Sequence, residues 1–265
     1  MIKINNFMNN NDIKALESKG PFSIIEYQRD LSVTPWDAQS AFFCNQMGVR
    51  KRQVVCKMND SVGITTQAGA MQWSAGNVNA TTGVKGVGDL LKKSFKGAAS
   101  GESTIKPEYT GSGILVLEPT YRHLFILDLE SDWQGGVVLD DGLFKACTSN
   151  LEHTLVARSN VSSVVFGKEG LFNLCLTGKG LVVCESAVPK EELVLVELNN
   201  DVLKIDGPLA VAWSPSLNFS VERSGKTLVG SAASGEGLVN VYRGTGKVLM
   251  APVNGPRILS LPGQN

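Results

Sequence analysis

The stretch Gly111-Ser112-Gly113-Ile114-Leu115-Val116-Leu117 recurs twice farther along the chain. Its counterparts are Gly178-Lys179-Gly180-Leu181-Val182-Val183 and Gly244-Thr245-Gly246-Lys247-Val248-Leu249. Each copy joins a Gly-x-Gly turn to an apolar run, and the first glycines of the three copies are almost evenly spaced. Because glycine accepts backbone angles that other residues avoid, this spacing predicts one turn and one strand, used three times.

Other residues recur at the same period. Glu102, Glu169 and Glu236 are evenly spaced, and Leu139-Asp140 returns as Ile205-Asp206 one period later. A fainter match relates Ala70-Met71-Gln72-Trp73 to Ala210-Val211-Ala212-Trp213, about two periods later. The sequence therefore predicts three pseudo-repeats of about 66 residues, which we place at 54–121, 122–187 and 188–252.

Within the repeats the chain is predicted to form short strands rich in Val, Leu and Ile and bounded by turn residues. The clearest are Leu124–Leu129, Leu171–Leu176, Leu181–Cys184, Leu193–Glu197, Val202–Ile205, Leu209–Trp213, Leu238–Tyr242 and Val248–Met250. In many of them the apolar residues run together instead of alternating, which indicates strands that are buried on both faces or packed in a sandwich or barrel. We expect an all-β fold, with three units closed about a pseudo-threefold axis into one antiparallel body.

Residues 1–48 precede the repeats and are expected to form a partly helical extension. Thr34 can cap a helix that begins at Pro35 and stops before Gly48, so we predict a helix at about 35–47. Its apolar stripe of Trp36, Phe43 and Met47 is expected to pack against the β body. Shorter helices are predicted at Leu90–Lys96 and Asp12–Ser18; residues 49–252 then form a single all-β domain, followed by a tail at 253–265.

Composition excludes several classes of protein. The 265 residues carry 25 basic and 25 acidic side chains and are 43% hydrophobic, which fits neither a disordered chain nor a strongly basic nucleic-acid binder. No stretch has the roughly 20 apolar residues of a membrane-spanning helix, and the first residues show no secretion signal. Five cysteines without a Cys-x-x-Cys pair indicate free thiols and a cytoplasmic location.

Basic residues nevertheless gather in one segment. Between residues 50 and 96 there are eight basic residues against two acidic ones, whereas six acidic residues and one lysine lie between Asp128 and Glu152. Three interpretations remain open: a solvated face, complementary surfaces in an oligomer, or binding of an anionic partner such as nucleic acid or anionic lipid. The candidate anion-binding patch consists of Arg50, Lys51, Arg52, Lys92, Lys93 and Lys96.

Motifs for catalysis or cofactor binding are weak. Ser224-Gly225-Lys226-Thr227 ends like a phosphate-binding loop, but Ser220 stands where that motif needs glycine, so we predict a hairpin. His123 and His153 are the only histidines and lie well apart in the chain, which does not favour a transition-metal site. The repeat glutamates Glu102, Glu169 and Glu236 either support turns or converge on a cation such as calcium. We predict no catalytic residue, no cofactor and no metal.

The repeat segments, together with Ala68-Gly69-Ala70-Met71-Gln72-Trp73, resemble the altered inheritance of mitochondria family of mitochondrial-biogenesis proteins and its bacterial relatives. The resemblance covers roughly 55–252. It implies an all-β, double-stranded β-helix-like fold similar to that of the tryptophan RNA-binding attenuation protein. The mitochondrial members are associated with organisation of the inner membrane, and the family offers no catalytic residues to carry over.

Taken together, these patterns predict a non-enzymatic, cytoplasmic scaffold or interaction protein that forms a homo-oligomer. The alternative is a module that binds a ligand or nucleic acid through the basic segment 50–96. An enzyme of unknown reaction is a third hypothesis, for which the sequence offers no acid–base or metal constellation.

Overall fold

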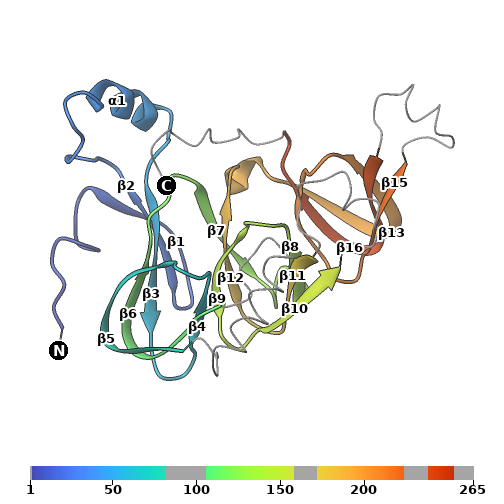
Figure 1. Cartoon of the computed structure of the whole chain (residues 1–265), viewed down its shortest axis with the longest axis horizontal. Helices are drawn as coiled ribbons and strands as arrows, with labels where there is room; N and C mark the ends of the chain where they lie inside the picture. Colours follow the sequence, from blue (N-terminus) through green and yellow to red (C-terminus); the bar gives the residue numbers. More distant parts are fainter. Residues whose placement is uncertain (1, 82–105, 158–171, 224–237, 254–265) are drawn as a thin grey trace, which may run out of the picture.

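The protein is built almost entirely of antiparallel β-strands. The computed structural model describes residues 2–81, 106–157, 172–223 and 238–253, and Figure 1 shows its strands ordered along one long axis. Within these ranges the only helical elements are α1 (Ala38–Gln46) and the short 3-10 turn η1 (Lys190–Glu192). The predicted all-β fold class is confirmed.

The first sheet has nine strands and is nearly closed into a barrel. Along its path the order is β1-β2-β3-β6-β4-β9-β12-β7, and β5 pairs with β6. Its two ends meet, because the Ile126 amide of β7 donates to Glu17 Oε2 of β1 at 3.1 Å and Lys19 pairs with Asp128 at 2.8 Å. The strands are β1 (Ile13–Lys19), β2 (Phe22–Tyr27), β3 (Arg52–Met58), β4 (Ile64–Thr66), β5 (Met71–Thr81), β6 (Glu108–Leu117), β7 (His123–Asp128), β9 (Phe144–Thr148) and β12 (Leu181–Ser186).

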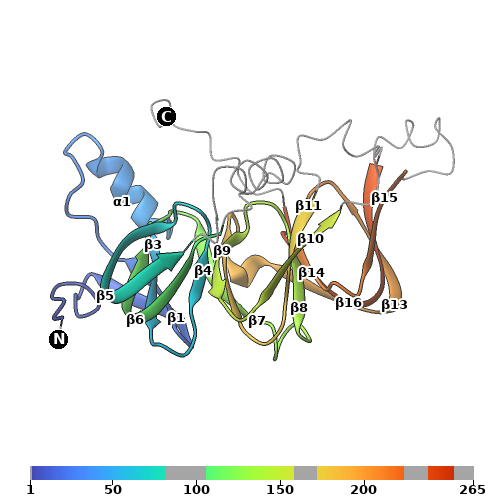
Figure 2. The same ribbon diagram turned by 60° about the horizontal axis from the view of Figure 1, so that its bottom comes forward.

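The second sheet has seven strands and forms a half-barrel beside the first (Figure 2). Its order is β10-β11-β8-β14-β16-β13, and β15 also pairs with β16. The strands are β8 (Gly136–Leu139), β10 (Glu152–Ala157), β11 (Phe172–Thr177), β13 (Val194–Asp206), β14 (Ala210–Trp213), β15 (Asn218–Arg223) and β16 (Leu238–Met250).

The apolar runs in the sequence arise because single strands serve two cores. On β12, Val182 and Cys184 belong to one buried cluster while the intervening Val183 belongs to another, and all three are fully buried. A strand with both faces covered gains about 25 cal/mol for each Å² of apolar surface removed from water on either side, so polar residues find no favourable position along it. Burial on both faces is thus confirmed for β12, whereas most residues of β13, where two of the predicted strands lie, are exposed.

Some predicted boundaries between strands are wrong. Leu193–Glu197 and Val202–Ile205 were expected as two strands, but they are the two halves of the 13-residue β13. The polar residues between them form a bulge between Leu198 and Asp201, where Asn200 has φ +51°. A bulge tolerates residues that otherwise mark turns, which is why the pattern suggested a break. Likewise, β16 joins the two predicted strands at Leu238–Tyr242 and Val248–Met250.

The N-terminal extension differs from expectation in two ways. The helix predicted at Asp12–Ser18 is instead strand β1, which pairs with β2 from Ile13↔Tyr27 to Lys19↔Phe22. Sheet pairing here overrides a weak helical pattern. The helix predicted at 35–47 is present as α1, but its stripe does not pack on the β body: Trp36 and Met47 are 92% and 81% exposed. The predicted helix at Leu90–Lys96 lies outside the described residues.

The strand register follows the sequence period in the second and third predicted units. Glu152↔Thr177 in β10–β11 corresponds to Asn218↔Arg243 in β15–β16, one period later. Gly178 and Gly244 both have φ +119°, and each lies beside a buried leucine, Leu151 or Leu217. The repeat of three whole units stays a prediction.

The units are arranged differently from the expected threefold closure. Strand pairing joins the first unit to the second through β4–β9, and the second to the third through β8–β14. Among the described strands, none of the first unit pairs with one of the third, and the units lie in a row along the long axis (Figure 1). The molecule therefore has two distinct ends instead of a closed ring of units.

Candidate interaction surfaces

The three cations of the candidate anion-binding patch that the structure describes are already paired. Arg50 and Arg52 both contact Glu26, at 3.2 and 2.8 Å, and Lys51 contacts Asp30. The hydrogen bond to Lys51 lowers the pKa of Asp30 from its usual range, so this pair is ionic at neutral pH. These contacts attach the N-terminal extension to strand β3 and leave less positive charge for an external anion.

The remaining residues of that patch, Lys92, Lys93 and Lys96, lie outside the described residues, so the patch stays a prediction. The same holds for the candidate cation ligands Glu102, Glu169 and Glu236. In the ranges that the structure does cover, no group of three or more His, Cys, Asp or Glu side chains is placed to hold a metal ion.

One cysteine and one histidine do meet. Cys147 Sγ lies 3.4 Å from His153 Nε2, next to the Phe144 ring. Burial raises the pKa of Cys147 to about 12 and lowers the pKa of His153, so both groups are neutral near pH 7. A neutral thiol beside a neutral imidazole lacks the thiolate that nucleophilic catalysis needs, and the pair fits a role in the core.

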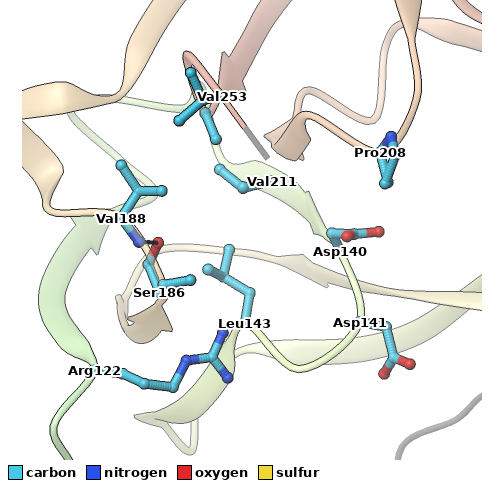
Figure 3. Close-up of a pocket in the computed structure, with 11 residues that line it drawn as sticks. Arg122, Asp140, Asp141, Leu143, Ser186, Val188, Pro208, Val211 and Val253 are labelled. Atoms are coloured by element: carbon cyan, nitrogen blue, oxygen red, sulfur yellow. Dashed lines mark hydrogen bonds between the residues drawn. The ribbon is translucent and has the colours of Figure 1, made fainter. Parts of the chain in front are cut away.

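A small pocket lies where the two sheets adjoin (Figure 3). It has a volume of about 140 Å³ and is lined by residues that include Arg122, Asp140, Leu143 and Ser186. The Ser186 hydroxyl already accepts a hydrogen bond from the Val188 amide at 3.0 Å. Sites for small molecules usually enclose about 300–1,000 Å³, so this pocket is too small for most metabolites.

Apolar side chains are exposed on and around α1, which projects from the β body (Figure 2). Besides Trp36 and Met47, Phe42 and Phe43 are more than half exposed, and their rings contact each other edge to face at 5.5 Å. The helix is held mainly by polar contacts at its C-terminal end: Asn45 Nδ2 donates to the Gln28 carbonyl, and Arg50 donates to Asn45 Oδ1. No helix in the described ranges is long and apolar enough to cross a membrane.

Among the described strands, the longest with an unpaired edge are β5 and β13. β5 pairs only with β6, and β13 pairs only with β16, as far as the described residues show. They are 11 and 13 residues long and lie at opposite ends of the long axis in both Figure 1 and Figure 2. Each edge therefore presents a row of backbone donors and acceptors to whatever adjoins it.

Sequence reasoning did not identify these edges, although it came close to one. The sequence match of Trp73 with Trp213 is one residue out of register. Val116 and Leu249 are equivalent positions in the matched segments, and they pair with Trp73 and Ala212 respectively, so the structural counterpart of Trp73 is Ala212. Bulges after Met71 and Ala210 obscure the alignment. A correct alignment would have shown that β5 in the first predicted unit and β13 in the third are the strands left without a neighbouring unit.

Comparison with known proteins places the chain in a family. Residues 46–253 match the family described as mitochondrial biogenesis AIM24. An uncharacterised protein of Streptococcus pyogenes serotype M6 is 28% identical over 197 residues, which are 71% of this chain and 76% of that protein. A Streptococcus pyogenes protein solved by X-ray crystallography shares the fold, with a TM-score of 0.57 and 24% identity, over 78% of this chain and 89% of the other.

These findings agree with the resemblance shown by the repeat segments. Since the family match spans well over half of its residues, the chain belongs to the mitochondrial biogenesis AIM24 family.

Proposed function

We propose that this protein is a non-enzymatic scaffold that works as a homo-oligomer in the cytoplasm. The observation that carries the proposal is that the outer edges of β5 and β13 have no strand partner among the described residues. Strands in globular proteins are usually about 5–6 residues long, and long edges are normally covered or kept short because they attract other strands. Two edges of 11 and 13 residues, at opposite ends of one molecule, suit a protein that binds further chains by strand addition.

Other features support the remaining parts of the proposal. The neutral Cys147–His153 pair argues for a non-enzymatic role. All five cysteines are unpaired, and Cys44 among them is exposed, which is compatible with a reducing compartment.

The alternative, binding of a ligand or nucleic acid through residues 50–96, has less support. The ion pairs of Arg50, Lys51 and Arg52 occupy half of the residues named for it. An enzyme is the third alternative, and no described constellation of side chains favours a reaction.

The test is the mass of the full-length chain in solution. Light scattering coupled to size-exclusion chromatography, over a wide range of protein concentration, should give a mass well above the 28.3 kDa of one chain. The mass should fall towards that value on dilution, because oligomers dissociate by mass action. A mass of one chain at every concentration would overturn the proposal.

A further inference from the structure

The chain uses one strand contact twice. Between the first and second units, β4 pairs with β9 through Thr65↔Cys147 and Thr66↔Ala146. Between the second and third units, β8 pairs with β14 through Val138↔Trp213 and Leu139↔Ala212. We call β4 and β8 the donating strands and β9 and β14 the receiving strands. The two paired residues of β4 and those of β8 are separated by one constant number of positions, and the same is true of β9 and β14. The two contacts are antiparallel and share one register.

The donating strand has a counterpart in the third unit. Ile64 of β4 pairs inside its unit with Tyr109, and Val137 of β8 pairs with Leu176, one period beyond Tyr109. After one more period, Tyr242 pairs with Leu203 of β13. Residues 203–205 of β13 are therefore equivalent to 64–66 and 137–139, but no described strand lies on their outer side.

The receiving strand has a counterpart in the first unit. Ala146 of β9 pairs with Val183, and Ala212 of β14 pairs with Leu249. The equivalent pair in the first unit is Trp73↔Val116, so residues 73–75 of β5 correspond to 146–148 and 212–214. The described part of the chain supplies no donating strand at this position.

From these equivalences we propose that a second copy of this chain supplies the missing strand partner at each end of the molecule. Residues 203–205 of β13 in one copy add antiparallel to residues 73–75 of β5 in the next, with Ile205 opposite Trp73, Lys204 opposite Ser74 and Leu203 opposite Ala75. The inference rests on the proposed homo-oligomeric function and names its interface.

The burial of equivalent residues is consistent with this interface. In the internal contacts the paired residues are buried, with Val138 at 1%, Ala146 at 0% and Trp213 at 4% exposure. At the two ends of the molecule, Lys204 and Ser74 are exposed and Trp73 is half-buried. Pairing the ends removes their remaining surface from water and sets a lysine opposite a serine, without two like charges facing each other.

Phe7 contributes to the same end. Its ring lies edge to face against Trp73, with the ring centroids 5.2 Å apart, and covers part of the tryptophan. The contact shields the face of Trp73, while the outer backbone edge of β5 has no strand partner in the described residues.

The geometry makes the interface head-to-tail. β5 and β13 lie at opposite ends of the long axis, so each copy has one donating and one receiving end (Figure 1). Such heterologous contacts close into rings or extend into filaments, in contrast to the symmetrical pairing of a simple dimer.

Cysteine cross-linking tests the register in the full-length chain. Cys44→Ser removes the exposed thiol, while the other four cysteines are buried. Into this background, Ser74→Cys and Lys204→Cys are introduced separately, at exposed positions that should not affect folding. Directly opposed residues in antiparallel strands have Cα atoms about 4.5–5.5 Å apart, which is within the range of a disulfide. Mixing the two variants under mild oxidation should give a disulfide-linked pair of chains, and combining both changes in one chain should give covalent multimers.

A matched control moves one cysteine out of register. Val202→Cys replaces an exposed residue two positions away on the same strand face. Paired with Ser74→Cys it should cross-link far less, because diagonal Cα atoms are about 7–8 Å apart. Self-linking of Ser74→Cys alone would indicate a symmetrical interface and overturn the proposal.

The outcome also separates this inference from the proposed function. If light scattering shows an oligomer but the 74–204 pair does not cross-link in preference to the 74–202 pair, the interface proposed here is wrong while the scaffold proposal stands. If the chain is monomeric at every concentration, both fail.

Discussion

The first sheet is nearly closed, whereas the second is a half-barrel. The difference comes from the N-terminal residues. β1 and β2 extend the first sheet from β3, and β1 then meets β7 through Glu17 and Lys19. The described residues contain no such pair of strands beside the second sheet. Closure is therefore provided by strands of residues 1–48, which precede the predicted repeats, and the described part of the second sheet has no such strands and stays a half-barrel.

The largest expected effect follows from the role of β2 in closing the first sheet. Phe22 is fully buried in the core with Ile24 and Val54. Phe22→Ala should lower the free energy of unfolding by about 3–5 kcal/mol, since it leaves a cavity the size of a phenyl ring. Guanidinium denaturation followed by tryptophan fluorescence measures the change.

The matched control is the same substitution in α1. Phe43 is 57% exposed, so Phe43→Ala should change the free energy of unfolding by no more than about 0.5 kcal/mol. If both variants lose the same small amount, the N-terminal strands are dispensable and the closure described here is wrong.

The half-barrel should respond less strongly. Phe219 of β15 is half-buried against Tyr242 and Trp213, with ring centroids 5.1 and 5.7 Å away. Phe219→Ala should cost about 1–3 kcal/mol, because it loses aromatic contacts and only part of a fully buried side chain's apolar area. The comparison is made at low protein concentration, where a second copy contributes least. A loss equal to that of Phe22→Ala would contradict the open half-barrel.

The sequence was informative wherever one physical effect dominated. The apolar run on β12 correctly indicated two buried faces, and the glycines at 178 and 244 correctly indicated equivalent turns with positive φ. It failed where tertiary context decides. The pattern of Asp12–Ser18 fits a helix, but the neighbouring β2 makes it a strand, and the local sequence around α1 does not reveal that Trp36 is exposed.

The candidate site was less predictable than the fold. Ion pairing of Arg50 and Arg52 with Glu26 depends on the β2–β3 pairing, which brings Glu26 opposite Arg52. The unpaired edges of β5 and β13 depend on which units lie at the ends, and therefore on the order of units in space. Charge counts along the chain reveal neither which strands pair nor the order of the units in space.

The smallest expected effect concerns an ion pair in the first, nearly closed sheet. Glu185 of β12 contacts Lys145 of β9 at 2.9 Å, and the Thr120 hydroxyl donates to the same carboxylate. Burial alone would raise the pKa of Glu185, but the charge and hydrogen bond of Lys145, the hydrogen bond from Thr120 and the charge of Arg122 together lower the pKa below the usual 4.5. A carboxyl group whose pKa is lower in the folded state stabilises the fold above the unfolded value, and that contribution is lost as the pH falls below about 4.5.

Glu185→Gln should therefore flatten the decline in the free energy of unfolding between about pH 4.5 and more acidic values. Urea denaturation at a series of pH values measures this slope. Glu130→Gln is the control, because Glu130 and its partner Lys179 are both largely exposed and such pairs contribute little to stability. An unchanged slope in Glu185→Gln would mean that the Lys145 pair does not distinguish the folded from the unfolded chain. A slope that changes equally in both variants would assign the effect to net charge instead of to the strand contact between β9 and β12.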